Sequence, residues 1–174
     1  NSGNHYQYMA NTLQINNGCG DFSDIAHMAG IAKTDWSWAG LLVDLDNDGF
    51  KDIIISNGVK KDVRNNDFLT GLYEKLKTDS QDFYSMTKSA PSVPLSNYAF
   101  KNTGNLKFEK VTKSWGFDTP SFSSGMAYGD LDNDGDLDIV VNNMEDSAFV
   151  YENKSTGNFI KIDLEGSDFN TFGY

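Results

Sequence analysis

The 174-residue sequence contains a single cysteine, Cys19, so no disulfide can form within the chain. Disulfide-free chains occur in the cytosol and also among secreted bacterial proteins, so the cysteine count leaves the compartment open. No run of 18 apolar residues occurs, and the sequence therefore predicts no transmembrane helix. Basic residues are also few, with 14 Lys and Arg against 25 Asp and Glu. The resulting net charge of −11 argues against a nucleic-acid partner, because phosphates need a basic surface.

The common catalytic motifs are missing as well. The sequence has no GxSxG, no HExxH, no phosphate-binding loop and no CxxC, and its two histidines, His5 and His27, stand alone. We therefore predict no catalytic residue and a non-enzymatic role for the chain. A carboxylate pair for glycoside hydrolysis stays open as an alternative, since such a pair has no sequence signature.

What the sequence does have is a core-forming composition and an internal repeat. Hydrophobic residues make up 39% and aromatic residues 13%, which is typical of a folded domain. Residues 11–58 align with 97–144 at a constant offset of 86 without a gap, and 15 of the 48 columns are identical. The chain opens at NSGNHYQY without Met and stops at FNTFGY, so we expect a segment of a larger protein.

Each repeat has the pattern of consecutive β-strands. TLQIN and YAFKN alternate and end in Gly-containing turns, while DIIISN and DIVVNN are the β-branched runs of buried strands. Strands are also expected at FSDIA and FEKVT, at WAGLLVD and GMAYGD, and at AFVY and FIKIDLEG near the end. The expected division is a first repeat at 1–58, an insertion at 59–96, a second repeat at 97–146 and further strands at 147–174.

The insertion has helical periodicity. Phe68, Leu72 and Leu76 recur every four residues, and Asn66 or Asp67 is a candidate N-cap. A second short helix is expected over 80–88. Surface decoration is one interpretation of this insertion, and a partner-binding or lid element is the other.

Two aspartate-rich loops carry the chemistry, and both have the pattern D-x-D-x-D-G-x-x-D. Carboxylates at positions 1, 3, 5 and 9, with a backbone carbonyl at position 7, supply the six to eight oxygens that Ca²⁺ prefers. A glycine at position 6 permits the sharp turn. Two Ca²⁺ sites are thus predicted, and their candidate ligands are Asp44, Asp46, Asp48, Phe50 and Asp52 in the first loop and Asp130, Asp132, Asp134, Asp136 and Asp138 in the second.

The alternatives to this kind of calcium site fit less well. An EF-hand needs a bidentate Glu at position 12, where this sequence has Ile55 and Val141, and it needs helices rather than strands on both sides. Mg²⁺ rarely fills an all-protein cage, and Zn²⁺ prefers Cys or His ligands. Two Asx-Gly turns without metal remain the plain alternative.

The segments DLDNDGFKDIIISNG and DLDNDGDLDIVVNN resemble FG-GAP or VCBS repeats, as in the calcium-binding blades of integrin α-subunits. Most of the chain, apart from the insertion at 59–95, resembles secreted VCBS-repeat proteins with a C-terminal ASPIC/UnbV domain, including cartilage acidic protein-like chains. The tail FIKIDLEGSDFNTFGY is similar to the start of that domain. The resemblance implies an all-β fold of β-propeller blades with structural Ca²⁺. Two repeats cannot close a propeller, so the expected fold is a partial propeller with a helical insertion.

The expected function is that of a calcium-binding interaction module for a protein or a glycan. The resemblance implies an extracellular, cell-surface or periplasmic location, with the bacterial envelope favoured. Further blades or another chain would complete the propeller. Two alternatives are part of a secreted polysaccharide-active enzyme and an accessory subunit of an outer-membrane assembly. Trp36 and Trp38 are interpreted as packing between blades, with a sugar-stacking face as the second reading.

Overall fold

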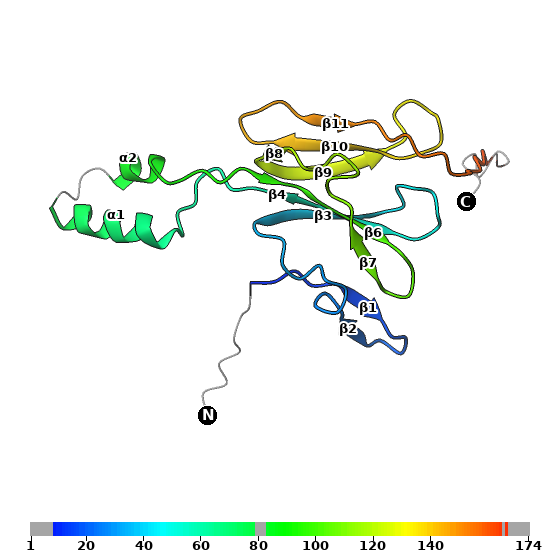
Figure 1. The fold of residues 1–174 in the computed structure, drawn as a ribbon, viewed down its shortest axis with the longest axis horizontal. Coiled ribbons are helices and arrows are strands. Elements are labelled where there is room, and N and C mark those ends of the chain that lie inside the picture. The colour runs from blue at the N-terminus through cyan, green and yellow to red at the C-terminus, as the bar shows by residue number, and fades with distance from the viewer. Residues whose placement is uncertain (1–8, 79–82, 165, 167–174) are drawn as a thin grey trace.

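The computed structural model describes residues 9–78, 83–164 and 166, and within them the chain is mostly β-structure with two helices (Figure 1). The strands are β1 (Gln14–Asn16), β2 (Phe22–Asp24), β3 (Ser37–Val43), β4 (Asp52–Asn57), β5 (Leu95–Ser96), β6 (Tyr98–Asn102), β7 (Phe108–Lys110), β8 (Pro120–Ser121), β9 (Ser123–Gly129), β10 (Asp138–Asn143) and β11 (Phe149–Tyr151). The helices are α1 (Asn66–Thr78) and α2 (Phe83–Lys88).

The central element is a four-stranded antiparallel sheet in the order β3-β4-β6-β7. Its second strand, β4, is buried along its whole length, as its isoleucine run predicts. Ile54 pairs with Leu41 on one side and with Ala99 on the other. Strand β4 thus pairs with β3 on one side and with β6 on the other. Burying a side chain such as Ile54 stabilises the folded state by about 1.5–3 kcal/mol.

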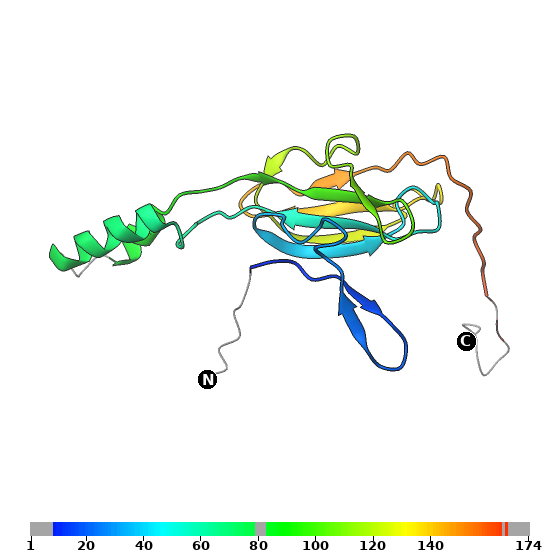
Figure 2. The same ribbon diagram turned by 60° about the horizontal axis from the view of Figure 1, so that its bottom comes forward.

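A second sheet, in the order β11-β10-β9, lies against the first (Figure 1). Strand β9 lies next to β3, so the edge strands of the two sheets run side by side. The short pair β5-β8 links the sheets at one end, and the β1-β2 hairpin lies on the other side of the four-stranded sheet (Figure 2).

Two apolar cores hold these layers together. The first lies between the two sheets and contains Val43, Ile54, Ile139 and Val141 among its fully or almost fully buried members. The second fills the space between the opposite face of the four-stranded sheet and the segment that follows β2. Its members are Ala26, Ala29, Ile31, Ala32, Ile53, Ile55 and Phe100. Ile54 of β4 therefore packs in the first core and its neighbours Ile53 and Ile55 pack in the second, because successive side chains of a strand point to opposite faces of the sheet.

The sheets are staggered relative to the sequence repeats. Strands β3 and β4 come from the first repeat, whereas β6 and β7 of the same sheet come from the second. The β1-β2 hairpin of the first repeat corresponds to β6-β7 of the second, because the 86-residue offset superposes them. The sheet is thus formed across the boundary between repeats.

The insertion forms an arm that projects from the sheets (Figures 1 and 2). Its base is a ribbon in which Val59 and Val93 exchange backbone hydrogen bonds. The predicted apolar face of α1 is confirmed, with Leu72 buried. The cap differs from the prediction: the Asn65 side chain accepts the Phe68 amide hydrogen bond at 3.0 Å, one residue before the expected candidates. The second helix, predicted over 80–88, is present as α2 from Phe83 to Lys88, and residues 79–82 lie outside the described residues.

One expectation about the sheets is wrong. The strand predicted at FIKIDLEG does not form over 159–164, where alternation alone supplies no hydrogen-bonding partner; residue 165 lies outside the described part. Trp38 is 55% exposed and donates from Nε1 to the Gly58 carbonyl at 2.6 Å, and Trp36 stacks under the Arg64 guanidinium at 3.7 Å. Packing of the tryptophans between blades stays a prediction, because it needs a neighbouring blade.

Candidate metal-binding loops

Each aspartate-rich loop connects two antiparallel strands at the same end of its sheet. The first joins β3 to β4 and is closed by the pair Val43 and Asp52, and the second joins β9 to β10. Gly49 and Gly135 adopt φ values of 89° and 93°, so the glycine predicted for position 6 is required by the backbone. The sequence therefore places both loops correctly between strands.

The structure brings together the first three aspartates of each loop. One carboxylate oxygen each from Asp44, Asp46 and Asp48 lie within 4.8 Å of one another, and the same holds for Asp130, Asp132 and Asp134. Turn hydrogen bonds shape the first loop: Asp44 accepts from the Gly49 amide at 2.9 Å. Three carboxylates at such a separation repel one another unless a cation lies among them.

Position 9 has a different role from the first three aspartates. Asp52 is fully buried, and its two oxygens accept hydrogen bonds from the Leu45 amide at 3.0 Å and the Asn102 amide at 2.8 Å. Burial raises the pKa of Asp52, while the two backbone hydrogen bonds oppose that rise. The side chain therefore ties the start of its loop to the strand that follows the insertion.

Asp138 repeats this arrangement in the second loop. It accepts from the Leu131 amide at 2.9 Å and from the Asn153 amide at 2.8 Å. We call Asp52 and Asp138 the clamp aspartates. Both lie outside the two three-carboxylate groups, although a carboxylate oxygen that accepts one hydrogen bond keeps a second lone pair for a metal.

Position 7 differs between the loops. Phe50 was predicted to offer its carbonyl; its ring is half-exposed and lies over Gly104. Asp136 was predicted in the same way, but its side chain is 2% exposed and one of its oxygens accepts the Ser155 amide at 2.8 Å. Burial, with the Asp134 carboxylate nearby, raises the pKa of Asp136.

Several buried carboxylate oxygens in these loops lack a hydrogen-bond partner among the described residues. They are Oδ1 of Asp46, Oδ1 of Asp130 and Oδ1 of Asp136. Buried polar atoms are normally paired, so these three oxygens point to an additional positive partner. A hard cation that takes carboxylate oxygens, such as Ca²⁺, fits this donor set.

A lysine that the sequence analysis missed faces the first loop. The Lys101 ammonium contacts Asp46 and lies 3.4 Å from Asp48. The Asp46 carboxylate raises the pKa of Lys101. Lys101 is 55 residues from Asp46, and only the pairing of β4 with β6 brings the two together.

The segment after β11 passes over both loops, and we call residues 153–161 the strap. Asn153 donates from its side chain to the Leu45 carbonyl at 2.6 Å and to the Leu137 carbonyl at 3.2 Å. Farther along, Gly157 packs against Asn47 so closely that a side chain there would clash. The loops also touch directly through Asn47 and Gly135, at 3.3 Å. They therefore form one connected region.

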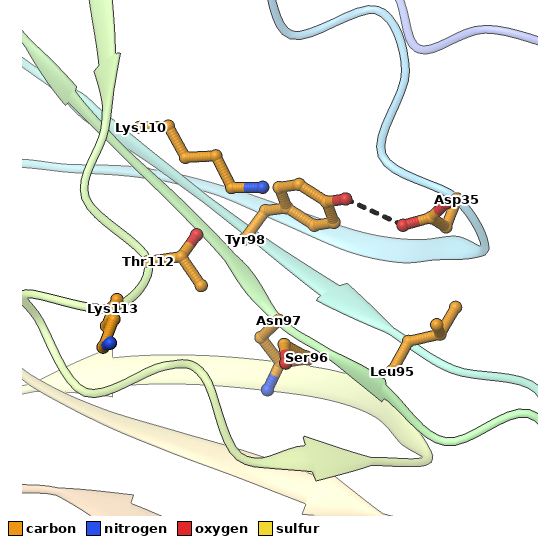
Figure 3. Close-up of a pocket in the computed structure, with 8 residues that line it drawn as sticks. All are labelled: Asp35, Leu95, Ser96, Asn97, Tyr98, Lys110, Thr112 and Lys113. Carbon is orange, nitrogen blue, oxygen red and sulfur yellow. Dashed lines mark hydrogen bonds between the residues drawn. The ribbon is translucent and has the colours of Figure 1, made fainter.

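A separate pocket of about 470 Å³ lies between the start of β6 and the segment after β7 (Figure 3). Tyr98 donates its hydroxyl to Asp35 at 2.7 Å, and the Lys110 ammonium lies 4.0 Å from the centre of the Tyr98 ring. Burial and the Asp35 hydrogen bond raise the pKa of Tyr98 to about 12. Among the eight residues that line this pocket, Asp35 is the one carboxylate.

Among the described residues, neither helix has the length and hydrophobicity needed to cross a bilayer. No curated protein matches the chain. Residues 80–141, which include strands β6 to β9 and the second aspartate loop, match the family model of the FG-GAP-like repeat. Such repeats are typical of extracellular or envelope proteins. The match covers about a third of the 174-residue chain, and the largely β-structure of the described residues is consistent with such a repeat.

Proposed function

We propose that this chain is a calcium-binding β-propeller segment in which Ca²⁺ at the two aspartate loops stabilises the fold. The observation that carries the proposal is a set of three buried carboxylate oxygens, on Asp46, Asp130 and Asp136, for which the described residues supply no hydrogen-bond partner. Asp46 and Asp130 belong to the two groups of three carboxylates whose oxygens lie within 4.8 Å of one another, and Asp136 lies in the same loop as the second group. A cation there would offset the repulsion and so stabilise the folded state over the unfolded one.

Calorimetric titration of the chelator-stripped chain with CaCl₂ tests this proposal. We expect two sites, one lost in Asp46→Ala and the other lost in Asp132→Ala. Asp21→Ala, an exposed carboxylate in the β1-β2 turn, is the matched control for the change in net charge and should retain both sites. At a Ca²⁺ concentration of about 100 times Kd, each occupied site should stabilise the folded state by about 2.7 kcal/mol. Absence of both heat and thermal stabilisation at millimolar Ca²⁺ would overturn the proposal.

The role that we propose for the folded segment is interaction with a protein or glycan outside the cytoplasm. It is supported by the FG-GAP-like match and by exposed apolar side chains on the adjacent edge strands. Trp38 and Leu42 on β3 are each 55% exposed, and Tyr128 on β9 is 50% exposed. A glycan array probed with the Ca²⁺-loaded chain tests the glycan case: binding that is lost in Trp38→Ser and kept in Phe22→Ser would support it.

Each of the two alternative functions suggested by the sequence is supported by one structural observation. The projecting arm favours an accessory subunit that docks onto a larger assembly (Figure 1). Replacing residues 62–90 by a short glycine linker keeps the bridge at its base and should abolish assembly without lowering the stability of the sheets. For a segment of a polysaccharide-active enzyme, the pocket of Figure 3 is the place to look, although its one carboxylate, Asp35, is already hydrogen-bonded. The similarity of the tail to an ASPIC/UnbV domain stays a proposal.

A further inference from the structure

The hydrogen bonds of the clamp aspartates show which residues of the two sheets correspond. Asn102 donates its amide to Asp52 and Asn153 donates its amide to Asp138, both at 2.8 Å. The residues just before these asparagines are Lys101 and Glu152. The position that carries a positive charge beside the first loop thus carries a negative charge beside the second.

The two charged side chains also differ in their exposure and in their ion-pair partners. Lys101 is two-thirds buried and turns onto the carboxylates of Asp46 and Asp48. Glu152 is 63% exposed and pairs with Lys154 at 3.7 Å. Near the second loop the Lys161 ammonium reaches the amide oxygen of Asn133 at 3.4 Å, and no described ion pair joins an ammonium to a carboxylate of that loop.

The loops differ further in the number of acidic groups that can attract a cation. The first has four carboxylates, its own Lys51 and the contacting Lys101, which gives a formal charge of −2, whereas the second has five carboxylates and a formal charge of −5. The additional carboxylate is Asp136, which is 2% exposed and lies near Asp134 and Asp138. The described residues supply no hydrogen-bond partner for its Oδ1. Phe50 occupies the corresponding place in the first loop.

We infer that the two loops are unequal cation sites: the loop 130–138 takes Ca²⁺ at the lower concentration, and Lys101 serves the loop 44–52 as an internal counter-cation that the metal must displace. The inference rests on the proposed function, since it concerns the same sites. The ammonium neutralises part of the repulsion between Asp46 and Asp48 before metal arrives. A divalent ion gains less there than at the second loop, where the corresponding repulsion is unrelieved.

Calorimetry on single-site variants tests this inequality. In Asp132→Asn the first loop is the remaining site, and in Asp46→Asn the second loop remains. We expect a Kd at least about tenfold lower for the second loop. Adding Lys101→Met to Asp132→Asn should tighten the first loop by up to about fivefold, because partly exposed ion pairs contribute up to about 1 kcal/mol. Lys33→Met, an exposed lysine between β2 and β3, changes the net charge equally and should leave the Kd unchanged.

The reciprocal change moves the lysine to the other loop. Glu152→Lys in the Asp46→Asn chain should weaken the second site, while Glu152→Gln should weaken it less. Circular dichroism of each apo variant establishes that the chain is folded before titration. If the two loops bind Ca²⁺ with Kd values within twofold, or if Lys101→Met leaves the first site unchanged or weaker, the inference is wrong and the calcium proposal stands. If no variant or wild type binds Ca²⁺, both fail together.

Discussion

The clamp aspartate Asp52 provides the sharpest test of how these loops are built. Its carboxylate accepts hydrogen bonds from two backbone amides in the folded chain, those of Leu45 and Asn102. Leaving a buried donor unsatisfied costs about 1–3 kcal/mol, and the loss of two such hydrogen bonds gives about 2–6 kcal/mol. Removing a buried carboxylate relieves part of its own desolvation, so we expect Asp52→Ala to lose about 3 kcal/mol.

The measurement is urea unfolding in excess chelator, where no metal contributes. With a denaturant slope of about 2 kcal/mol/M, the unfolding midpoint should fall by about 1.5 M. The control is Asp46→Ala in the same loop, which removes only a partly exposed ion pair with Lys101 and should shift the free energy of unfolding by at most about 1 kcal/mol.

Added Ca²⁺ separates the two roles. It should stabilise the wild-type chain and lose its effect at the first loop in Asp46→Ala. If Asp52→Ala is as stable as wild type in chelator and differs only when Ca²⁺ is present, then the position-9 carboxylate acts as a metal ligand and the reasoning about the clamp is refuted. Asp52→Asn, which keeps the shape and one acceptor, should lie between the two.

Three further predictions concern other parts of the molecule. The folded state raises the pKa of Tyr98 from 10.0 to about 12, so the neutral phenol stabilises the fold below about pH 10 and this contribution disappears as the pH rises to about 12; the stability difference between wild type and Tyr98→Phe should shrink across that window in urea titrations, and a constant difference would contradict the assignment. Asn65→Ala should cost about 1 kcal/mol by removing the cap of α1, whereas Asn66→Ala, the matched control one residue later, should cost less; equal losses would place the cap elsewhere. Gly157→Ala should speed amide exchange in the strap while the sheets stay protected, and unchanged exchange there would show that the strap does not lie on the first loop.

Features that depend on neighbouring residues were predictable from the sequence. The β-branched run of β4, the alternation of β6 and the glycines of both loops specify their conformation locally. The apolar face of α1 follows from its spacing for the same reason. The carboxylates at positions 1, 3 and 5 gather as the loop spacing predicts, because the loop is short and turns at a glycine.

Features that depend on which strands pair were not predictable. The sequence places Asp52 in a ligand pattern, but its role as a clamp needs the amide of Asn102, 50 residues away. The contact of Lys101 with the first loop arises from the same pairing of β4 with β6 across the arm. The alternation at 159–164 failed as a strand signal for the converse reason, since in the described residues no strand pairs with it.

The stagger between repeat and sheet has a consequence for how such a chain can lengthen. One repeat begins with the strand pair that completes a sheet, as β6-β7 does, and ends with the strand pair that begins the next sheet, as β9-β10 does. Each added copy therefore completes the sheet that the preceding copy began, and half-formed sheets occur only at the two ends of the array. Growth by gene duplication can thus proceed one unit at a time without leaving an incomplete sheet in the middle of the protein.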